Sequence, residues 1–235
     1  MSHGLVWTER PRRKPVWPWI LVAICLLCLM MRLAFEFIGP GNQVAWLNFW
    51  GFRPDAIASR LLGDPAHWLD PELLGLLSAL FIHIDWVHLV GNLAYLWVFG
   101  LAVERAIGHW WFGLLFLVLG GLANVYVALH MDSSAVPVIG ASGGVSAIMG
   151  IYLGLFPSRR MGLWVPLGLY LQFVKVPAVL VIGSWFTLQL LYSVFGPIST
   201  DVAWSAHIAG FILGLAAAML LRLPPGYYHL TAREE

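Results

Sequence analysis

Apolar stretches recur along this chain of 235 residues, and they restrict it to folds whose solvent is lipid. A helix needs about 20 mostly apolar residues to cross a bilayer. The sequence predicts spans near 17–38, 86–106, 110–130, 142–157, 177–195 and 203–222. Only 11% of the residues are charged, whereas a soluble domain has roughly 25%. Because lipid cannot satisfy open sheet edges, we expect an all-α membrane protein with six transmembrane helices in one bundle, residues 17–222.

The distribution of Lys and Arg predicts how this bundle is oriented, because these residues collect in cytoplasmic segments. Residues 1–16 and the tail 223–235 are expected in the cytoplasm, and 39–85, interrupted by Gly and Pro, is expected to be a large external loop. The predicted inside segments contain Arg10, Arg12, Arg13, Lys14, Arg105, Arg159, Arg160, Lys175, Arg222 and Arg233. Arg32 lies within the first span, where Glu36 is one helical turn away and can pair with it.

Composition also limits the partners and cofactors of this chain. The net charge of +1 gives no reason to expect nucleic-acid binding. Cys25 and Cys28 form a CxxC inside the first span, and no other cysteine is present to complete a redox or metal site. We therefore interpret them as packing residues and predict no metal and no other cofactor. The first apolar run is longer than that of a signal peptide, so we expect it to be a retained transmembrane helix. Six spans, a basic N-terminus and no transit-like presequence favour a multi-pass protein of a bacterial inner membrane.

Four polar residues stand out inside the predicted spans, where lipid makes polar groups costly and function the default hypothesis. His88 and Asn92 are four residues apart, on one face of the second helix. Ser142 begins the fourth span within GASGG, and His207 lies near the start of the sixth within AHIAG. With the N-terminus inside, these three helices all run from outside to inside. The four residues are therefore expected at one depth, near the outer surface.

Small residues predict that the fourth and sixth helices approach each other closely. They recur at four-residue intervals, as Ser142, Ser146, Gly150 and Gly154 on one helix and Gly210 and Gly214 on the other. Such packing would bring Ser142 within hydrogen-bond reach of His207. The fourth span covers about 24 Å, less than the roughly 30 Å of a hydrocarbon core. Ser142 is then expected below the membrane surface, in a water-filled cavity open to the outside.

This arrangement predicts acyl transfer by a serine nucleophile. A serine hydroxyl needs a base to take its proton, and His207 is the candidate at that depth. No carboxylate is obviously placed to orient the ring, so a dyad is expected, with Asp201 a minor candidate for a third member. His88 and Asn92 can donate hydrogen bonds to an oxyanion, as can the backbone N–H of Ser142. Taken singly, each residue could equally be a packing or helix-contact residue; their coincidence favours catalysis.

Four further residues are expected to support this site. Gly140 and Gly143 flank the serine and permit tight turns and close substrate approach. Gly210 is expected to let the sixth helix approach the fourth. His83 is expected to hold the shape of the site from the external loop. A metal site made by His83 and His88 would lack a third ligand.

The segments that carry these residues resemble the rhomboid family of intramembrane serine proteases. The resemblance extends over about 68–222 and rests on four segments: FIHIDWVHLVGN at 81–92, GASGG at 140–144, VPAVLVIGSWFTLQLL at 176–191 and AHIAGFILG at 206–214. It implies a six-helix bundle that hydrolyses peptide bonds in or beside transmembrane segments of membrane proteins, without metal or nucleotide. The third segment is similar to the family's fifth helix.

The resemblance also implies roles for individual residues. Ser142 and His207 match the family's catalytic dyad, and His88 and Asn92 match its oxyanion positions. The fifth helix and the loop near 196–203 match the elements that admit substrate, which makes Trp185 and Phe186 candidates for a gate.

Two positions depart from the family pattern. Leu74-Gly75 stand where many members have Trp-Arg in the first external loop, so the loop must be anchored differently. Ser146 stands where some members have a tyrosine that stacks on the catalytic histidine, so His207 must be held by another residue.

Three other functions are compatible with parts of the sequence. A catalytically inactive rhomboid-like protein that binds membrane clients would share the fold, although such relatives generally lack the Ser or the His. A transporter would also place polar residues in the membrane, but the paired repeats common in transporters are absent from the sequence. The G-x-S-x-G pattern of an α/β-hydrolase needs a preceding strand, which the apolar spans exclude. Oligomeric state is not predictable from these features.

Overall fold

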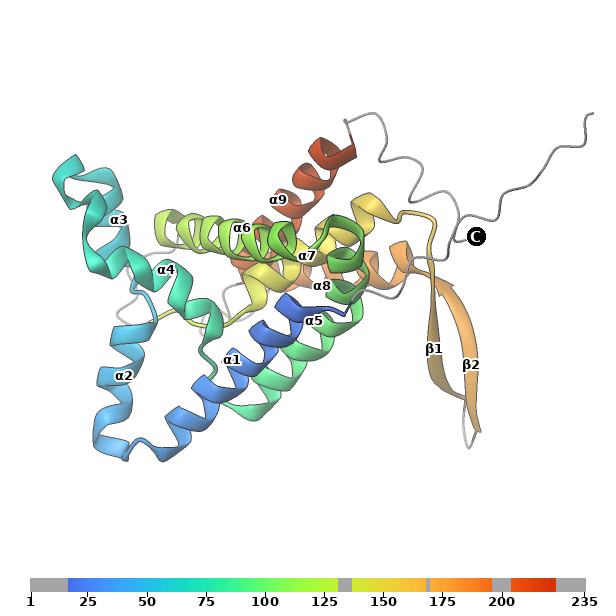
Figure 1. Ribbon diagram of the computed structural model, residues 1–235, viewed down its shortest axis with the longest axis horizontal. Helices are drawn as coiled ribbons and strands as arrows, with labels where there is room; N and C mark the ends of the chain where they lie inside the picture. Colours follow the sequence, from blue (N-terminus) through green and yellow to red (C-terminus); the bar gives the residue numbers. More distant parts are fainter. Residues whose placement is uncertain (1–16, 131–136, 168–169, 196–203, 223–235) are drawn as a thin grey trace, which may run out of the picture.

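A computed structural model describes residues 17–130, 137–167, 170–195 and 204–222 as a helical bundle with one hairpin (Figure 1). Six helices coincide within two residues with the predicted spans: α1 Trp19–Phe37, α5 Trp86–Ile107, α6 His109–His130, α7 Ser142–Leu155, α8 Ala178–Phe195 and α9 Trp204–Arg222. Among the described residues, five of these are long and apolar enough to cross a membrane, and α7 is shorter, with 14 residues. The predicted terminal segments, the loop at 196–203 and Asp201 lie outside the described residues.

Residues 39–85, the predicted external loop and named the external region below after that prediction, consist largely of short helices at one end of the molecule (Figure 1). They are α2 Gln43–Trp50, α3 Pro54–Leu62 and α4 Gly75–Ser78, with 3-10 turns at Pro40–Asn42, Pro65–Leu69, Pro71–Leu74 and Ala79–Phe81. Four of these elements begin with proline, which fits the first turn of a helix because the N–H missing there has no helical partner. None of the described helices in this region is long enough to span a membrane.

The segment between α7 and α8 adds a feature that the all-α prediction does not include. Strands β1 (Arg160–Leu167) and β2 (Tyr170–Pro177) form an antiparallel hairpin where the sequence predicts only a cytoplasmic connection. The hairpin projects from the end of the molecule opposite to α2 and α3 (Figure 1). Its sequence is rich in aromatic and β-branched residues, which favour strands. The rule that excludes sheet edges from hydrocarbon applies to the spans and not to such a connection.

Helix α7 is the centre of the bundle, and every residue from Gly143 to Tyr152 is buried. Its small residues face α9 directly. A Cβ atom added to Gly210 or Gly214 would overlap the backbone carbonyl oxygen of Gly143 or Ala147, respectively. The predicted close approach of these two helices is therefore confirmed, and the two backbones are in contact along the small-residue faces.

Two charged side chains connect α1 to α5. The carboxylate of Glu104, buried on α5, accepts the backbone N–H groups of Ile20 and Leu21 at 3.0 and 2.9 Å. These N–H groups at a helix start have no partner within the helix, so the carboxylate caps α1. Near the other end of α1, the predicted ion pair between Arg32 and Glu36 is present. The Arg32 guanidinium also lies 4.9 Å from the ring centre of Trp86, at the start of α5.

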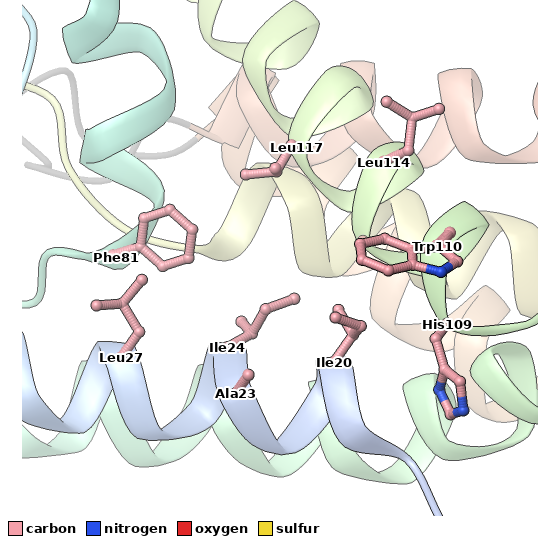
Figure 2. Close-up of a pocket in the computed structure, with 10 residues that line it drawn as sticks. Ile20, Ala23, Ile24, Leu27, Phe81, His109, Trp110, Leu114 and Leu117 are labelled. Atoms are coloured by element: carbon pink, nitrogen blue, oxygen red, sulfur yellow. The ribbon is translucent and has the colours of Figure 1, made fainter. Parts of the chain in front are cut away.

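An apolar pocket of about 390 Å³ opens between α1 and α6 (Figure 2). Its lining is Ile20, Ala23, Ile24, Leu27, Phe81, His109, Trp110, Gly113, Leu114 and Leu117. None of the predicted site residues belongs to this lining. The pocket is therefore separate from the candidate active site.

The contact between α7 and α9 predicts that Gly214→Ala destabilises the protein. The added methyl group would overlap the Ala147 carbonyl, so the helices must separate, and overpacking of this kind typically costs about 1–3 kcal/mol. We expect a clearly lower Tm in detergent micelles. The matched control is Gly183→Ala on α8, where the space around an added Cβ is open and Tm should stay the same or rise slightly. Equal Tm values for the two variants would contradict this packing.

Candidate active site

Ser142 is the first residue of α7, and the chain that leads to it is fixed by backbone hydrogen bonds. Phe52 and Val138 exchange two such bonds, at 3.2 and 2.7 Å, which join the external region to the segment before the serine. The N–H of Gly140 donates to the carbonyl of Ala79 at 2.9 Å. The position of Ser142 therefore depends on the external region as well as on α7.

The hydroxyl of Ser142 and the imidazole ring of His88 both lie close to Gly140. A Cβ atom added to Gly140 would lie 2.9 Å from His88 Nε2 and 3.8 Å from Ser142 Oγ. The glycine also has a φ of 118°, a conformation that side-chain-bearing residues rarely adopt. Only glycine fits this position, because any side chain would collide with the imidazole ring.

Asn92 and His83 form a buried pair next to the residue that precedes Ser142. The Asn92 amide nitrogen lies 3.1 Å from the His88 carbonyl oxygen and 3.3 Å from His83 Nε2. The Ala141 N–H also points to His83 Nε2, at 3.5 Å. His83 therefore connects α5 to the residue before Ser142. Because both N–H groups of Asn92 have acceptors in this arrangement, Asn92 must exchange one of them before it can donate to an oxyanion.

His83 is neutral at physiological pH. Burial, and secondarily the neighbouring His88, lower the pKa of His83 from its ordinary 6.5 to about 3. The ring is 1% exposed, and its centre lies 5.0 Å from the ring centre of His88. A neutral ring is what the contacts of Nε2 require, since that nitrogen accepts the hydrogen bonds described above.

His207 lies on α9, beside the part of that helix that touches the start of α7. Its neighbour Ala206 has its carbonyl oxygen 3.9 Å from a Cβ added to Gly143, and Gly210, one turn later, is in contact with the same glycine. Ser142 is therefore next in sequence to Gly143, and His207 is next to Ala206, at the place where α7 and α9 touch. In the described part of the chain, no hydrogen bond joins their side chains, so the predicted bond between Ser142 and His207 stays a prediction.

Gln189 is a candidate site residue that the sequence interpretation missed. Its side-chain oxygen lies 2.8 Å from His207 Nδ1, and the residue is buried on α8. It is a polar residue inside the predicted span 177–195, which is the same signal that identified His88 and Asn92. Four residues earlier on the same helix, Trp185 stacks on the His207 ring, with ring centres 6.3 Å apart and planes 29° apart.

The two departures from the family pattern have structural counterparts. The Ser146 hydroxyl donates to the Ser142 carbonyl at 2.7 Å, within α7, and it is α8 that provides a hydrogen bond and a stacked ring to His207. The external region is fixed near Leu74-Gly75 by other bonds. Asn124 of α6 donates to the Leu76 carbonyl at 2.7 Å, and the Ser78 hydroxyl donates to the Trp50 carbonyl at 2.6 Å.

The remaining predicted residues have clear locations. Phe186, like Trp185, packs against Phe211 of α9, with ring centres 4.7 Å apart for Phe186. Across the ranges that the structure describes, His, Cys, Asp and Glu form no group of three or more that could hold a metal ion. Cys25 and Cys28 are both free thiols.

Comparison with known proteins identifies the family. The profile described as the rhomboid domain matches residues 70–224, well over half of the chain. This chain belongs to the rhomboid family. All the candidate residues, Ser142, His207, His88, Asn92 and Gln189 included, lie within the matched range.

Several curated relatives in this family are rhomboid proteases named GlpG. One from Salmonella paratyphi A is 31% identical over 217 residues, and those from Salmonella newport and Salmonella typhimurium are each 30% identical over the same length. Each alignment covers 91% of this chain and 65% of the relative. The chain therefore spans slightly less than two thirds of the length of these rhomboid proteases.

The low pKa of His83 predicts that this residue destabilises the rhomboid fold in acid. Below pH 6.5 the unfolded chain binds a proton at His83 that the folded protein binds only near pH 3. The free energy of unfolding should therefore fall as pH falls from about 6.5, by up to roughly 1.4 kcal/mol per pH unit from this residue. In His83→Gln, denaturant unfolding in micelles should show a shallower pH dependence. The exposed His130→Gln serves as the control, and an unchanged slope in His83→Gln would refute the assignment.

Proposed function

We propose that this protein is a serine endopeptidase that cleaves peptide bonds in or next to transmembrane segments of other membrane proteins. The proposed location is the inner membrane of a bacterium, with both termini in the cytoplasm. The observation that carries the proposal is the convergence of a serine, two histidines and an asparagine at the start of α7. This convergence occurs in a chain of the rhomboid family, whose GlpG relatives are named as proteases.

In the proposed mechanism, Ser142 Oγ attacks the carbonyl carbon of the scissile peptide bond while His207 takes the hydroxyl proton. The tetrahedral intermediate collapses when His207 gives that proton to the leaving amine, which produces an acyl-enzyme on Ser142. Water then attacks the acyl group with His207 again as the base, and release of the carboxylate product restores the serine. The contact of Gly143 with α9 supports the pairing, because it brings the two helices together one residue from each member of the dyad.

The developing oxyanion needs hydrogen-bond donors that are already in position. His88 is the best-supported side chain, because its Nε2 atom and the Ser142 hydroxyl flank the same glycine. The backbone N–H of Ser142 is a second donor, since the first N–H groups of a helix have no partner within it. Asn92 contributes as a third donor if it releases the His88 carbonyl or His83; in its present contacts it holds the two rings in place.

Access of substrate and water follows from the length of α7. Its 14 residues extend about 21 Å, whereas a hydrocarbon core is about 30 Å thick. With its inner end at the cytoplasmic boundary, the serine would lie below the outer surface, at a depth where a transmembrane segment could reach it. Trp185 and Phe186 on α8 are proposed as the gate for that approach, because they line the side of α9 that carries His207.

Reconstitution into liposomes with a model transmembrane substrate tests the protease function. We expect the parent protein to cleave the substrate, and Ser142→Ala and His207→Ala to lose activity to the background, because each removes one half of the dyad. Ser184→Ala, which removes an exposed hydroxyl bonded within α8, should retain parent activity.

The same experiment separates the competing functions. An inactive client-binding protein would retain the substrate without cleaving it, in the parent and in the variants alike. A transporter would likewise leave the substrate intact. Equal cleavage by the parent and Ser142→Ala would contradict the serine mechanism.

A further inference from the structure

We infer that Gln189 is a positioning residue for His207: its side-chain oxygen accepts the Nδ1–H bond and leaves Nε2 free to take the proton of Ser142. This inference rests on the proposed function, because it assigns the third partner of the same catalytic pair. Gln189 would thereby orient His207 in a chain that has Ser146 where some family members have a tyrosine stacked on the histidine.

The geometry of this contact is specific. Gln189 Oε1 and His207 Nδ1 are 2.8 Å apart, across the contact between α8 and α9. Gln189 is 8% exposed, so little water is available to compete for the bond. A hydrogen bond in such an environment is stronger than at a wet surface, and loss of one partner leaves the other unsatisfied.

The chemistry of an amide determines which tautomer results. A carboxamide oxygen only accepts hydrogen bonds, so the hydrogen between these two atoms must belong to Nδ1. In a neutral imidazole the other nitrogen is then unprotonated and can act as a base. In serine proteases with a triad, a buried carboxylate performs this orientation. Here a neutral amide would perform it without burying a charge, whose desolvation in the membrane is costly.

Two aromatic rings limit the remaining freedom of His207. Trp185, one turn before Gln189, stacks on the imidazole, and Trp204, one turn before His207, contacts its ring edge-on with ring centres 5.7 Å apart. Stacking fixes the plane of the ring but leaves its rotation within that plane undetermined. The bond to Gln189 fixes that rotation. In the described residues, His207 makes no ion pair with a carboxylate that could do so instead.

A buried glutamine in a membrane bundle can also be only a helix–helix hydrogen bond. The two roles differ in what they change. A structural role affects Tm and leaves the chemistry of Ser142 unchanged in the protein that remains folded. A positioning role lowers kcat and the intrinsic reactivity of Ser142 in the folded protein, with KM largely unaffected, whether or not Tm also falls because the Nδ1–H group loses its partner.

The test compares Gln189→Met, which has nearly the same shape but no accepting oxygen, with Gln189→Glu, which keeps an acceptor. Three quantities are measured in micelles: Tm, kcat and KM for a model transmembrane substrate, and the rate at which a small fluorophosphonate labels Ser142. The fluorophosphonate needs the activated serine but not the docking of a transmembrane helix. Thr187→Leu on α8 is the matched control, because its exposed hydroxyl is bonded only within its own helix.

For Gln189→Met we expect kcat and the labelling rate to fall together by at least about tenfold, a part of the roughly 10²- to 10⁴-fold that general acid–base catalysis contributes. KM should change little, Gln189→Glu should recover most of the loss, and Thr187→Leu should match the parent. Folded Gln189→Met with parent kcat and labelling rate would overturn the inference, as would equal impairment of the Met and Glu variants. If the parent itself neither cleaves nor labels at Ser142, the proposed function fails rather than the role of Gln189.

Discussion

The contact between α7 and α9 is the interaction on which the rest of this structure depends. Gly210 and Gly214 leave no room for a side chain against the backbone of α7, so the two helices approach as closely as their backbones allow. In a bilayer, close packing of small residues replaces the hydrophobic effect as a source of helix association. The same contact brings the start of α9, which carries His207, to the start of α7, which carries Ser142.

The surrounding elements position the polar groups around that contact. Helix α5 contributes His88 and Asn92, and the external region contributes His83 and the backbone bonds that precede Gly140. Helix α8 contributes Gln189, which reaches the far nitrogen of His207. Four separate parts of the chain therefore meet at one end of α7. This convergence explains why polar residues that would be costly singly are tolerated together, since most of them have hydrogen-bond partners.

Much of this could be predicted from the sequence, because the bilayer imposes strict requirements. The ranges of six helices followed from runs of apolar residues, and the approach of α7 to α9 followed from small residues spaced by four. The hairpin at 160–177 could not be predicted in the same way, since a short apolar run does not by itself distinguish a strand from a helix. Gln189 was missed because its partner depends on how α8 is rotated against α9, which the spacing of residues along α8 does not determine.

The hydrogen bonds that the Asn92 side chain makes could likewise not be predicted from the sequence. The HxxxN spacing puts both side chains on one face of α5, and a direct role for both in oxyanion binding is the simplest interpretation. In the structure the Asn92 amide donates to the His88 carbonyl and to His83. Its proposed role in the reaction therefore includes holding these two histidines in place. The set of residues around the candidate site is then larger than the four polar residues that the sequence singled out.

The central claim is that Ser142 and His207 act together on one substrate carbonyl. Treatment of the reconstituted protein with a peptide chloromethyl ketone tests it most directly, because this reagent adds to a serine oxygen and alkylates a histidine nitrogen in the same site. Peptide mapping by mass spectrometry should find one adduct that bridges Ser142 and His207, and no such adduct in Ser142→Ala. Modification of other residues alone, at the same rate in the parent and in Ser142→Ala, would contradict the account.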